Sequence, residues 1–279
     1  MVGDALGAPA EFLDGDEIRA HYPDGILEMV PGFGIMTDRQ PGKVTDDTQM
    51  AVCLHRALEH ANGWSADATL REYLRWFATD PPDVGGAVRD ALEGYPNADS
   101  QGNGALMRVM PIALRAHAHP DFDWETAARE DAALTHPHPV CADCNAVYVY
   151  ALLQAMRPGA TRSGVYERTL GWIMAQHVDF SVTTTLLAAA DTAPEYDDHG
   201  GDRIGWVLIA LQCAFYHLLH APNLAAALTT IVTAGGDTDT NAAITAPLLA
   251  AIEGLDSLPP EWLRCVRQAN PEYAYLLPS

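Results

Sequence analysis

Two short acidic segments, far apart in the chain, carry residue types that could bind divalent metal. Thr45-Asp46-Asp47-Thr48 places two adjacent carboxylates between hydroxyls, and Asp237-Thr238-Asp239-Thr240 places two carboxylates two residues apart. Mg2+ and Mn2+ prefer oxygen ligands in octahedral arrangement, which carboxylate, hydroxyl and water can supply. Four carboxylates carry more charge than one divalent ion cancels, so convergence of the segments predicts two ions roughly 3.5–4 Å apart.

Each segment also has a simpler interpretation, because each precedes a predicted helix. Thr45 is a typical N-cap residue, and aspartate in a first helical turn complements the helix dipole. Gly235-Gly236 favours the metal site, since two glycines allow the tight turn that brings carboxylates together. Asn241 extends the polar run further than one helix start can use. We therefore expect one shared metal site built from 45–47 and 237–240.

A second candidate metal site has the pattern H-x-H-x2-C-x2-C, formed by His136, His138, Cys141 and Cys144. Structural zinc sites usually use two well-separated ligand pairs, and this sequence has no second C-x-x-C. Both cysteines also fall in a predicted helix, where cysteine commonly packs as a small hydrophobic residue. Zinc stays an alternative, and we expect His136 to donate to a ligand from a helix start.

The segments that must position these residues are predominantly predicted as helix. In 46–61, apolar residues including Met50, Leu54 and Leu58 fall on one face at helical spacing. Similar runs cover 66–78, 84–93, 104–117, 124–134, 140–156, 163–178, 182–191, 203–219, 223–233 and 240–253. Turn residues separate them at 41–42, 81–82, 158–159, 198–201 and 259–260. The sequence therefore predicts an all-α fold, a compact orthogonal bundle of about ten helices in one domain, 1–279.

The charge balance limits the partners. The chain of 279 residues carries 37 acidic and 16 basic residues, a formal net charge of −21. Such a surface repels nucleic acid and anionic membrane as general partners, and an anionic ligand must be neutralised locally. No export signal is visible at the N-terminus, the apolar stretch 206–221 is short for a membrane span, and five cysteines suggest no disulfide framework. These features predict a cytoplasmic protein.

Taken together, five motifs in order resemble the ADP-ribosylglycohydrolase family, which includes the dinitrogenase-reductase-activating glycohydrolases. The motifs are 3–12 (GDALGAPAEF), 45–50 (TDDTQM), 102–108 (GNGALMR), 135–136 (TH) and 235–242 (GGDTDTNA). The resemblance implies an all-α domain with two divalent cations, Mg2+ or Mn2+. It implies the metal ligands Thr45, Asp46, Asp47, Asp237, Asp239 and Thr240. It also implies that ADP-ribose is bound by Gly102, Asn103, Gly104, Met107, Arg108 and His136.

The implied reaction cleaves the bond between C1 of the distal ribose and a protein side chain or small acceptor. The metals would orient the ribose hydroxyls, and a metal-held water would attack C1. The catalytic candidates are Glu11, Asp46 and Asp47, between which the sequence does not assign acid and base. A phosphohydrolase acting on ADP-ribose 1-phosphate or a related nucleotide, and a non-catalytic ADP-ribose-binding protein, are the two alternatives.

Overall fold

The computed structural model describes residues 1–196 and 203–277, and within them α-helices dominate. They are α1 (Val2–Gly7), α2 (Gly15–His21), α3 (Asp46–His60), α4 (Ala66–Phe77), α5 (Gly86–Leu92), α6 (Met110–Ala118), α7 (Trp124–Ala133), α8 (Pro139–Ala155), α9 (Arg162–Ala175), α10 (Phe180–Ala188), α11 (Val207–His220), α12 (Leu224–Ala234), α13 (Thr238–Glu253) and α14 (Pro260–Ala269). Short 3-10 helices cover Ala8–Ala10, Leu255–Ser257 and Pro271–Leu276. The described part contains no β-strand, only two isolated bridges, so the all-α prediction is confirmed.

Two predicted helices begin later than expected, for related reasons. The helix expected over 104–117 starts at Met110, where Pro111 fits the first turn because its missing N–H would be unpaired there. The helix expected over 203–219 starts at Val207. Upstream of both, the backbones pair with each other: the Asn103 N–H donates to Gly205 O (2.9 Å) and the Val207 N–H to Gln101 O (2.9 Å). The turn expected at 198–201 lies outside the described residues.

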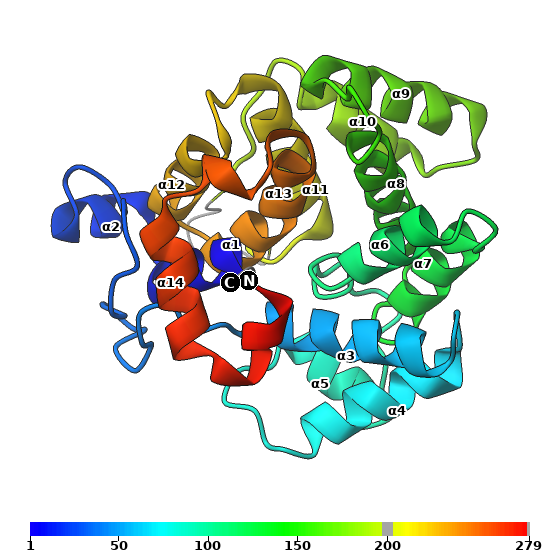
Figure 1. Ribbon diagram of the computed structural model, residues 1–279, viewed down its shortest axis with the longest axis horizontal. Helices are drawn as coiled ribbons and strands as arrows, with labels where there is room; N and C mark the ends of the chain where they lie inside the picture. The colour runs from blue at the N-terminus through cyan, green and yellow to red at the C-terminus, as the bar shows by residue number, and fades with distance from the viewer. Residues whose placement is uncertain (197–202, 278–279) are drawn as a thin grey trace.

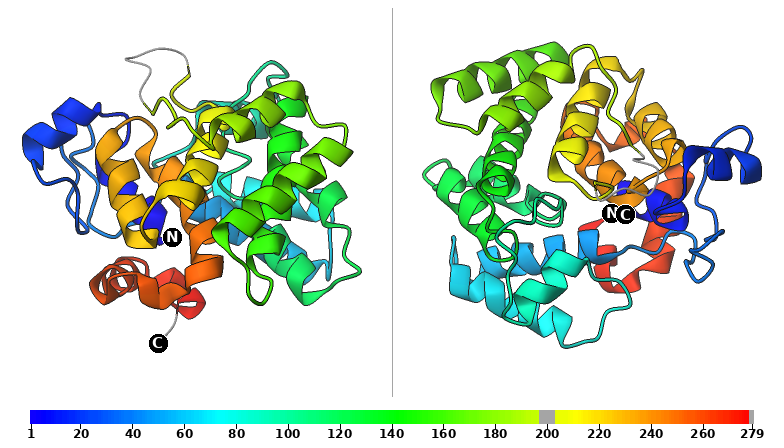
Figure 2. Two further views of the ribbon diagram at one scale, coloured as in Figure 1. Left: turned by 90° about the horizontal axis from the view of Figure 1, so that it is seen from above. Right: turned by 180° about the vertical axis from the view of Figure 1, so that it is seen from behind.

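Helices α1, α2 and α14 were not predicted, and α1 is the one that positions the site. It lies near the centre of the molecule beside α13 (Figures 1 and 2). A Cβ at Gly3 would stand 2.3 Å from Ala242 O, and one at Gly7 would stand 2.4 Å from the Asp239 N. Glycine at both positions, one helical turn apart, is therefore what lets α1 approach the first turns of α13.

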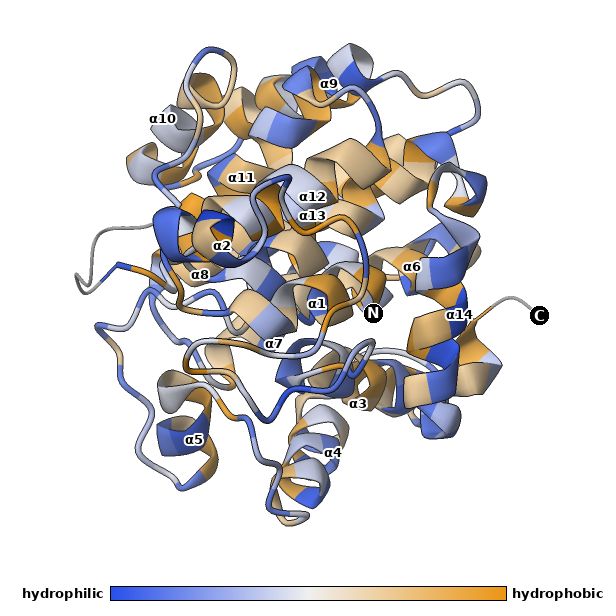
Figure 3. Ribbon diagram, turned by 90° about the vertical axis from the view of Figure 1, so that its left-hand side faces the viewer, coloured by the Kyte–Doolittle hydropathy of each residue, from blue (hydrophilic) through white to orange (hydrophobic). Residues whose placement is uncertain are grey.

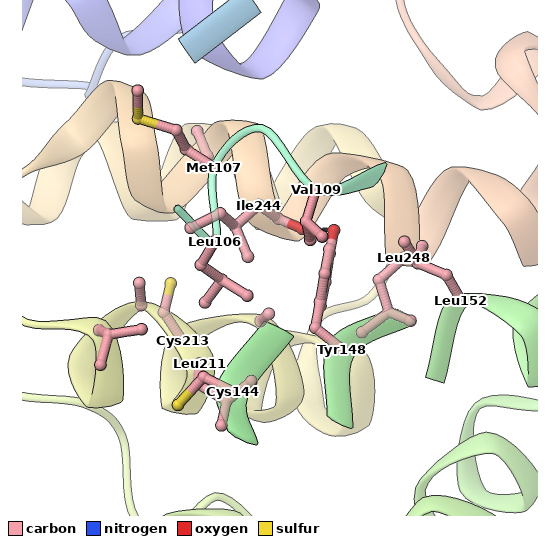
Figure 4. Packing of buried hydrophobic residues seen from close by; sticks show 14 of the residues in the cluster. Leu106, Met107, Val109, Cys144, Tyr148, Leu152, Leu211, Cys213, Ile244 and Leu248 are labelled. Carbon is pink, nitrogen blue, oxygen red and sulfur yellow. Dashed lines mark hydrogen bonds between the residues drawn. The ribbon is translucent and has the colours of Figure 1, made fainter. Parts of the chain in front are cut away.

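The core that supports this arrangement lies between α8, α11, α13 and the segment before α6. Figure 4 shows Leu106 and Cys213 packed here, with Tyr148 extending from α8 toward α13. The Tyr148 hydroxyl, which is fully buried, donates to Ile244 O, so the one polar atom of this side chain is paired. Hydropathy colouring shows hydrophilic residues gathered on the outlying α2 (Figure 3). Within 1–196 and 203–277, no helix has both the length and the apolar character that crossing a bilayer requires.

Candidate metal centre and active-site cavity

The N-terminus of α3 is capped by a carboxylate from another helix. Asp4, buried on α1, accepts hydrogen bonds from the backbone N–H groups of Thr45 (3.0 Å) and Thr48 (3.2 Å) and from both threonine hydroxyls. The Thr45 side chain makes no capping bond to α3. Thr45 is the N-cap residue and Asp46 and Asp47 lie in the first turn of α3, as the capping interpretation expected, but the capping bonds come from Asp4.

The two acidic segments converge on Asp47. Its Oδ2 accepts from the Thr45 hydroxyl (3.2 Å) and from the Thr240 hydroxyl of α13 (3.3 Å), although 193 residues separate Asp47 from Thr240. Asp237, which begins α13 without a side-chain cap, accepts from Asn103 Nδ2 (2.7 Å). The structure therefore brings the six expected ligands into one buried cluster.

The turn before Asp237 also places Glu11 at the cluster. Gly235 and Gly236 both have positive φ, +91° and +78°, as the sequence led us to expect. Their backbone pairs with the segment after Glu11: Phe12 N–H donates to Gly236 O (2.8 Å), and Gly236 N–H donates to Leu13 O (2.9 Å). Carboxylate oxygens of Glu11, Asp83 and Asp239 consequently lie within 4.8 Å of one another.

The cluster carries far more negative than positive charge. Burial, and then repulsion from Asp83 and other neighbouring carboxylates, raises the pKa of Glu11 to about 9 and that of Asp46 to about 8. Burial, and then repulsion from Asp4 at Asp47 and from Glu11 at Asp239, raises the pKa of these two carboxyls well above the ordinary range. Asp47 Oδ1 is buried with no hydrogen-bond partner. An unpaired carboxylate oxygen inside a crowded set of oxygen donors fits a hard divalent cation, so this cluster could bind metal.

A cavity of about 330 Å³ opens against one side of the cluster. Asp46, Asp237 and Thr240 form part of its wall, facing a group of the residues expected to bind substrate: Gly102, Asn103, Gly104, Met107 and His136. The two glycines are required by close packing, because a Cβ on either would stand 3.0–3.1 Å from the imidazole of His136. The segment 83–88, which leads into α5, forms a further part of the wall.

His136 offers the cavity a neutral N–H donor. Burial, and then the nearby charge of Arg108, lowers the pKa of His136 to about 3, so the ring is uncharged at neutral pH. The Thr135 hydroxyl accepts from Arg108 Nη1 (2.8 Å) and lies 2.9 Å from His136 Nδ1. When the hydroxyl donates its one proton to Nδ1, the ring proton resides on Nε2. Any bond that His136 donates to a ligand would therefore come from an uncharged ring.

Arg108 itself does not line the cavity. Its guanidinium is fully buried, donates from Nε to Asp131 Oδ2 (3.1 Å) and from Nη2 to Asp131 O (2.8 Å), and lies 4.5 Å from the Tyr73 ring centroid. Its charge is thus neutralised within the core rather than presented to a ligand. The resemblance implied that Arg108 binds ADP-ribose. The structure places its guanidinium behind the cavity wall, where Nη1 donates to Gly104 O (3.3 Å) and to the Thr135 hydroxyl (2.8 Å).

The four residues of the zinc alternative have other partners. His138 Nδ1 accepts from the backbone N–H of Val140 at the start of α8, and Cys141 Sγ lies 3.6 Å from Gly102 O. Cys141 and Cys144 are buried in the core. Among the residues that the structure describes, the metal-ligating side chains that gather tightly enough are instead Glu11, Asp83 and Asp239.

Three residues at the site were missed as members of it: Asp4, Asp83 and Arg39. Asp4 stood in a recognised motif, between the glycines of 3–7, but only the packing of α1 shows what its carboxylate does. Asp83 follows two prolines in an apparent loop, and Arg39 lies in a stretch without helical periodicity. No local pattern links either residue to the acidic segments, so their participation could not be read from spacing.

This geometry occurs in a chain that is similar to known ADP-ribosylglycohydrolases along its length. The family model described as ADP-ribosylglycohydrolase matches residues 1–277. The chain belongs to this family. It is 28% identical over 271 residues to the ADP-ribosyl-[dinitrogen reductase] glycohydrolase of Rhodospirillum rubrum, covering 94% of this chain and 85% of that protein. It is 28% identical over 286 residues to an ADP-ribosylarginine hydrolase of Pseudomonas putida, covering 95% and 71%.

A solved structure of a related protein has the same fold. One titled "ADP-ribosylglycohydrolase-related protein complex" superimposes with a TM-score of 0.80 at 28% identity, covering 98% of this chain and 91% of that one. The protein is therefore an enzyme, an ADP-ribosyl glycohydrolase with the all-α fold of its family.

Proposed function

We propose that this ADP-ribosyl glycohydrolase is metal-dependent and releases ADP-ribose from an arginine side chain of a modified protein or from a small arginine conjugate. The linkage is supported by the similarity to the ADP-ribosylarginine hydrolase of Pseudomonas putida. The metal dependence is supported by the acidic cluster, and the single observation that carries it is the buried, unpaired Oδ1 of Asp47 among carboxylates whose charge repels. We expect two divalent cations, Mg2+ or Mn2+.

The residues that would hold the ions are those whose oxygens converge: Thr45, Asp46, Asp47, Asp237, Asp239 and Thr240. Bound divalent ions would orient the ribose hydroxyls and polarise water. Asn103 fixes Asp237 through its Nδ2, and Asp4 fixes the Thr45 hydroxyl. Both contacts fix the orientation of oxygens that would bind metal, as residues around a metal site commonly do.

For the chemistry, the side chain of Asp46 is best placed to handle the proton of the attacking water. It lines the cavity, and its Oδ2 accepts from the Gly85 N–H (3.1 Å), which fixes its orientation. When C1 separates from a protonated guanidinium, the leaving nitrogen departs as neutral guanidine. The proton taken from water by Asp46 then restores the guanidinium, so the step balances without a separate acid.

His136 would bind the anionic part of ADP-ribose. Its Nε2–H would face the space beside Gly102 and Gly104. A diphosphate is repelled by the net negative charge of this protein, and hydrogen-bond donors such as this N–H would offset that repulsion locally. Met107 contributes an apolar surface to the same wall.

We also propose that residues 1–279 form one domain, which is supported by one connected hydrophobic core. We propose that the protein is cytoplasmic, which is supported by its five unpaired cysteines.

A substrate panel tests this function. The protein is incubated with peptides ADP-ribosylated on arginine or serine and with ADP-ribose 1-phosphate, each with Mg2+ or Mn2+ and with EDTA. We expect ADP-ribose from the arginine peptide, suppressed by EDTA and restored by added metal. Free phosphate as the product would instead support the phosphohydrolase, and release of ADP-ribose that is insensitive to EDTA would overturn metal dependence.

A further inference from the structure

Arg39 places a guanidinium of the protein itself between two carboxylates of the active-site cavity. Its Nη2 donates to Glu11 Oε2 (3.1 Å) and also to Asp83. The side chains of Glu11 and Asp83 line the cavity and are 9% and 23% exposed. The contact joins residues 28 and 44 positions apart, so it is a product of the fold rather than of local sequence.

Arg39 also separates this cavity from a second hollow. The second hollow, of about 510 Å³, is lined by Met36, Arg39, Gln40, Lys43 and Pro82 among others, whereas Glu11 and Asp83 line the first. Pro82 and Asp83 are consecutive residues that face different hollows. The guanidinium of Arg39 therefore stands in the partition, with the metal centre on one side and an outer space on the other.

The bonds of Arg39 are few for a guanidinium. Both use Nη2, and within the described residues its Nε and Nη1 donate to nothing. Arg108 shows the opposite case, in which Nε, Nη1 and Nη2 are all paired inside the core. Arg39 is also 22% exposed and lies in 31–43, a segment without helix or strand. Only two hydrogen bonds hold this guanidinium, and a substrate guanidinium that took its place would restore both charge pairings.

We propose that Glu11 and Asp83 form the subsite for the guanidinium of an arginine-linked substrate, and that Arg39 is an internal occupant which the substrate displaces. This inference rests on the proposed function, because it requires that the leaving group be an arginine. The substrate side chain enters from the outer hollow, and its guanidinium replaces that of Arg39 between the two carboxylates. Arg39 thereby competes with substrate, and it screens two carboxylates from each other while the subsite is empty of substrate.

The two partners of Arg39 explain why a guanidinium suits the subsite better than a compact cation. A planar guanidinium carries five N–H donors and can bond two carboxylates at once, whereas an ammonium is a point charge. Repulsion between Asp83 and Glu11 is the second largest cause, after burial, of the raised pKa of Glu11. A cation between them relieves that repulsion, so the pair selects for positive charge at the leaving group.

Binding of methylguanidine, a probe that needs no catalysis, tests the subsite. Calorimetric titrations with Mg2+ present would compare the wild type, Arg39→Ala, Arg39→Ala with Asp83→Asn, and the control Arg19→Ala, which removes an exposed arginine that pairs with Asp16. Removal of an occupant raises apparent affinity by the reciprocal of the fraction of protein in which the subsite was free. We expect Arg39→Ala to bind methylguanidine at least about tenfold more tightly, Arg19→Ala to match wild type, and Asp83→Asn to reverse the gain.

A second readout uses substrate. The KM of Arg39→Ala for an ADP-ribosylarginine peptide should fall by a similar factor, and melting curves verify that the variant is folded. Methylguanidine affinity that is equal to or weaker than wild type would overturn the proposal and leave Arg39 as a fixed positioning residue. Failure of the wild type to cleave the arginine peptide, with tighter methylguanidine binding by Arg39→Ala, would overturn the proposed function and not the subsite.

Discussion

Two buried groups of charged residues in this protein differ in whether their charges are balanced. Around Arg108, one cation meets one carboxylate, and the partners are complete: Asp131 also accepts from the Tyr73 hydroxyl (2.6 Å), and Tyr73 lies against the guanidinium. Around Asp47, carboxylates that repel one another gather, and within the described residues Asp47 Oδ1 has no hydrogen-bond partner. The first group is complete by itself, while the second requires protons or metal.

Charge balance distinguishes structural from functional charged residues better than burial does. Asp131 and Asp47 are both nearly inaccessible to solvent, at 0% and 2% exposure. What distinguishes them is whether the charge is neutralised within the chain. A balanced buried pair stabilises or at least specifies the fold, whereas an unbalanced cluster costs stability and persists where a ligand compensates it. The following predictions test that distinction, from the largest expected effect to the smallest.

Removal of two carboxylates from the unbalanced cluster should abolish hydrolysis. Asp46→Asn combined with Asp239→Asn is expected to lower kcat/KM by about 1,000-fold, since ligands directly on metal outweigh the 10–100-fold cost of surrounding residues. Calorimetry with Mn2+ should show the matching loss of binding heat. The exposed Asp67→Asn, in the first turn of α4, is the matched control. Turnover that survives the double substitution would remove the cluster from the mechanism.

Disruption of the balanced pair should instead affect folding. Arg108→Ala leaves Asp131 buried without its cation, and is expected to lower the free energy of unfolding by about 3–5 kcal/mol. Urea denaturation measures the change, with the exposed Arg71→Ala as control. Replacement of both partners by apolar residues, Arg108→Met with Asp131→Leu, should recover part of the loss. A stable Arg108→Ala with poor substrate affinity would contradict this assignment and return Arg108 to the ligand site.

Metal-free protein should lose stability as the pH rises. The pKa of Asp46 is about 8 in the folded state against an ordinary 3.8, and that of Glu11 is about 9 against 4.5. Between these values the folded state binds more protons than the unfolded chain, so stability falls from about pH 4 toward pH 9. Thermal melts in EDTA should show a Tm that drops by several degrees across this window. Asp46→Asn should flatten the slope, and saturating Mg2+ should reverse it.

The smallest effect concerns the histidine that joins the two groups. Thr135→Val removes the hydroxyl that donates to His136 Nδ1, so the ring is free to move its proton from Nε2. We expect KM to rise by about fivefold to tenfold, the value of one hydrogen bond, with kcat less affected. Nitrogen NMR of the imidazole reads the tautomer directly. An unchanged Nε2–H tautomer in the variant would show that Thr135 does not set it.

The sequence determined the helical elements with strong periodicity and the chemistry of the acidic motifs. Leu54 and Leu58 on one face predicted α3, and the paired glycines at 235–236 predicted the turn before Asp237. These are local properties: the amino-acid type and its spacing fix helix period and backbone freedom without reference to the rest of the chain. The helices α1 and α2, of six and seven residues, fell outside this reach because so few turns give little periodic signal, whereas α14, of ten residues, was missed although its apolar residues keep helical spacing.

Tertiary structure alone decided which charges are compensated. Nothing near Arg108 in sequence indicates that Asp131 and Thr135 would surround it, and nothing near Arg39 indicates Glu11 and Asp83. The electrostatic state of a side chain depends on solvent exclusion and on charges within a few ångströms, and both are set by residues distant in sequence. Composition therefore revealed an acidic protein with candidate ligands, and only folding separated a complete ion pair from a cluster that needs a cation.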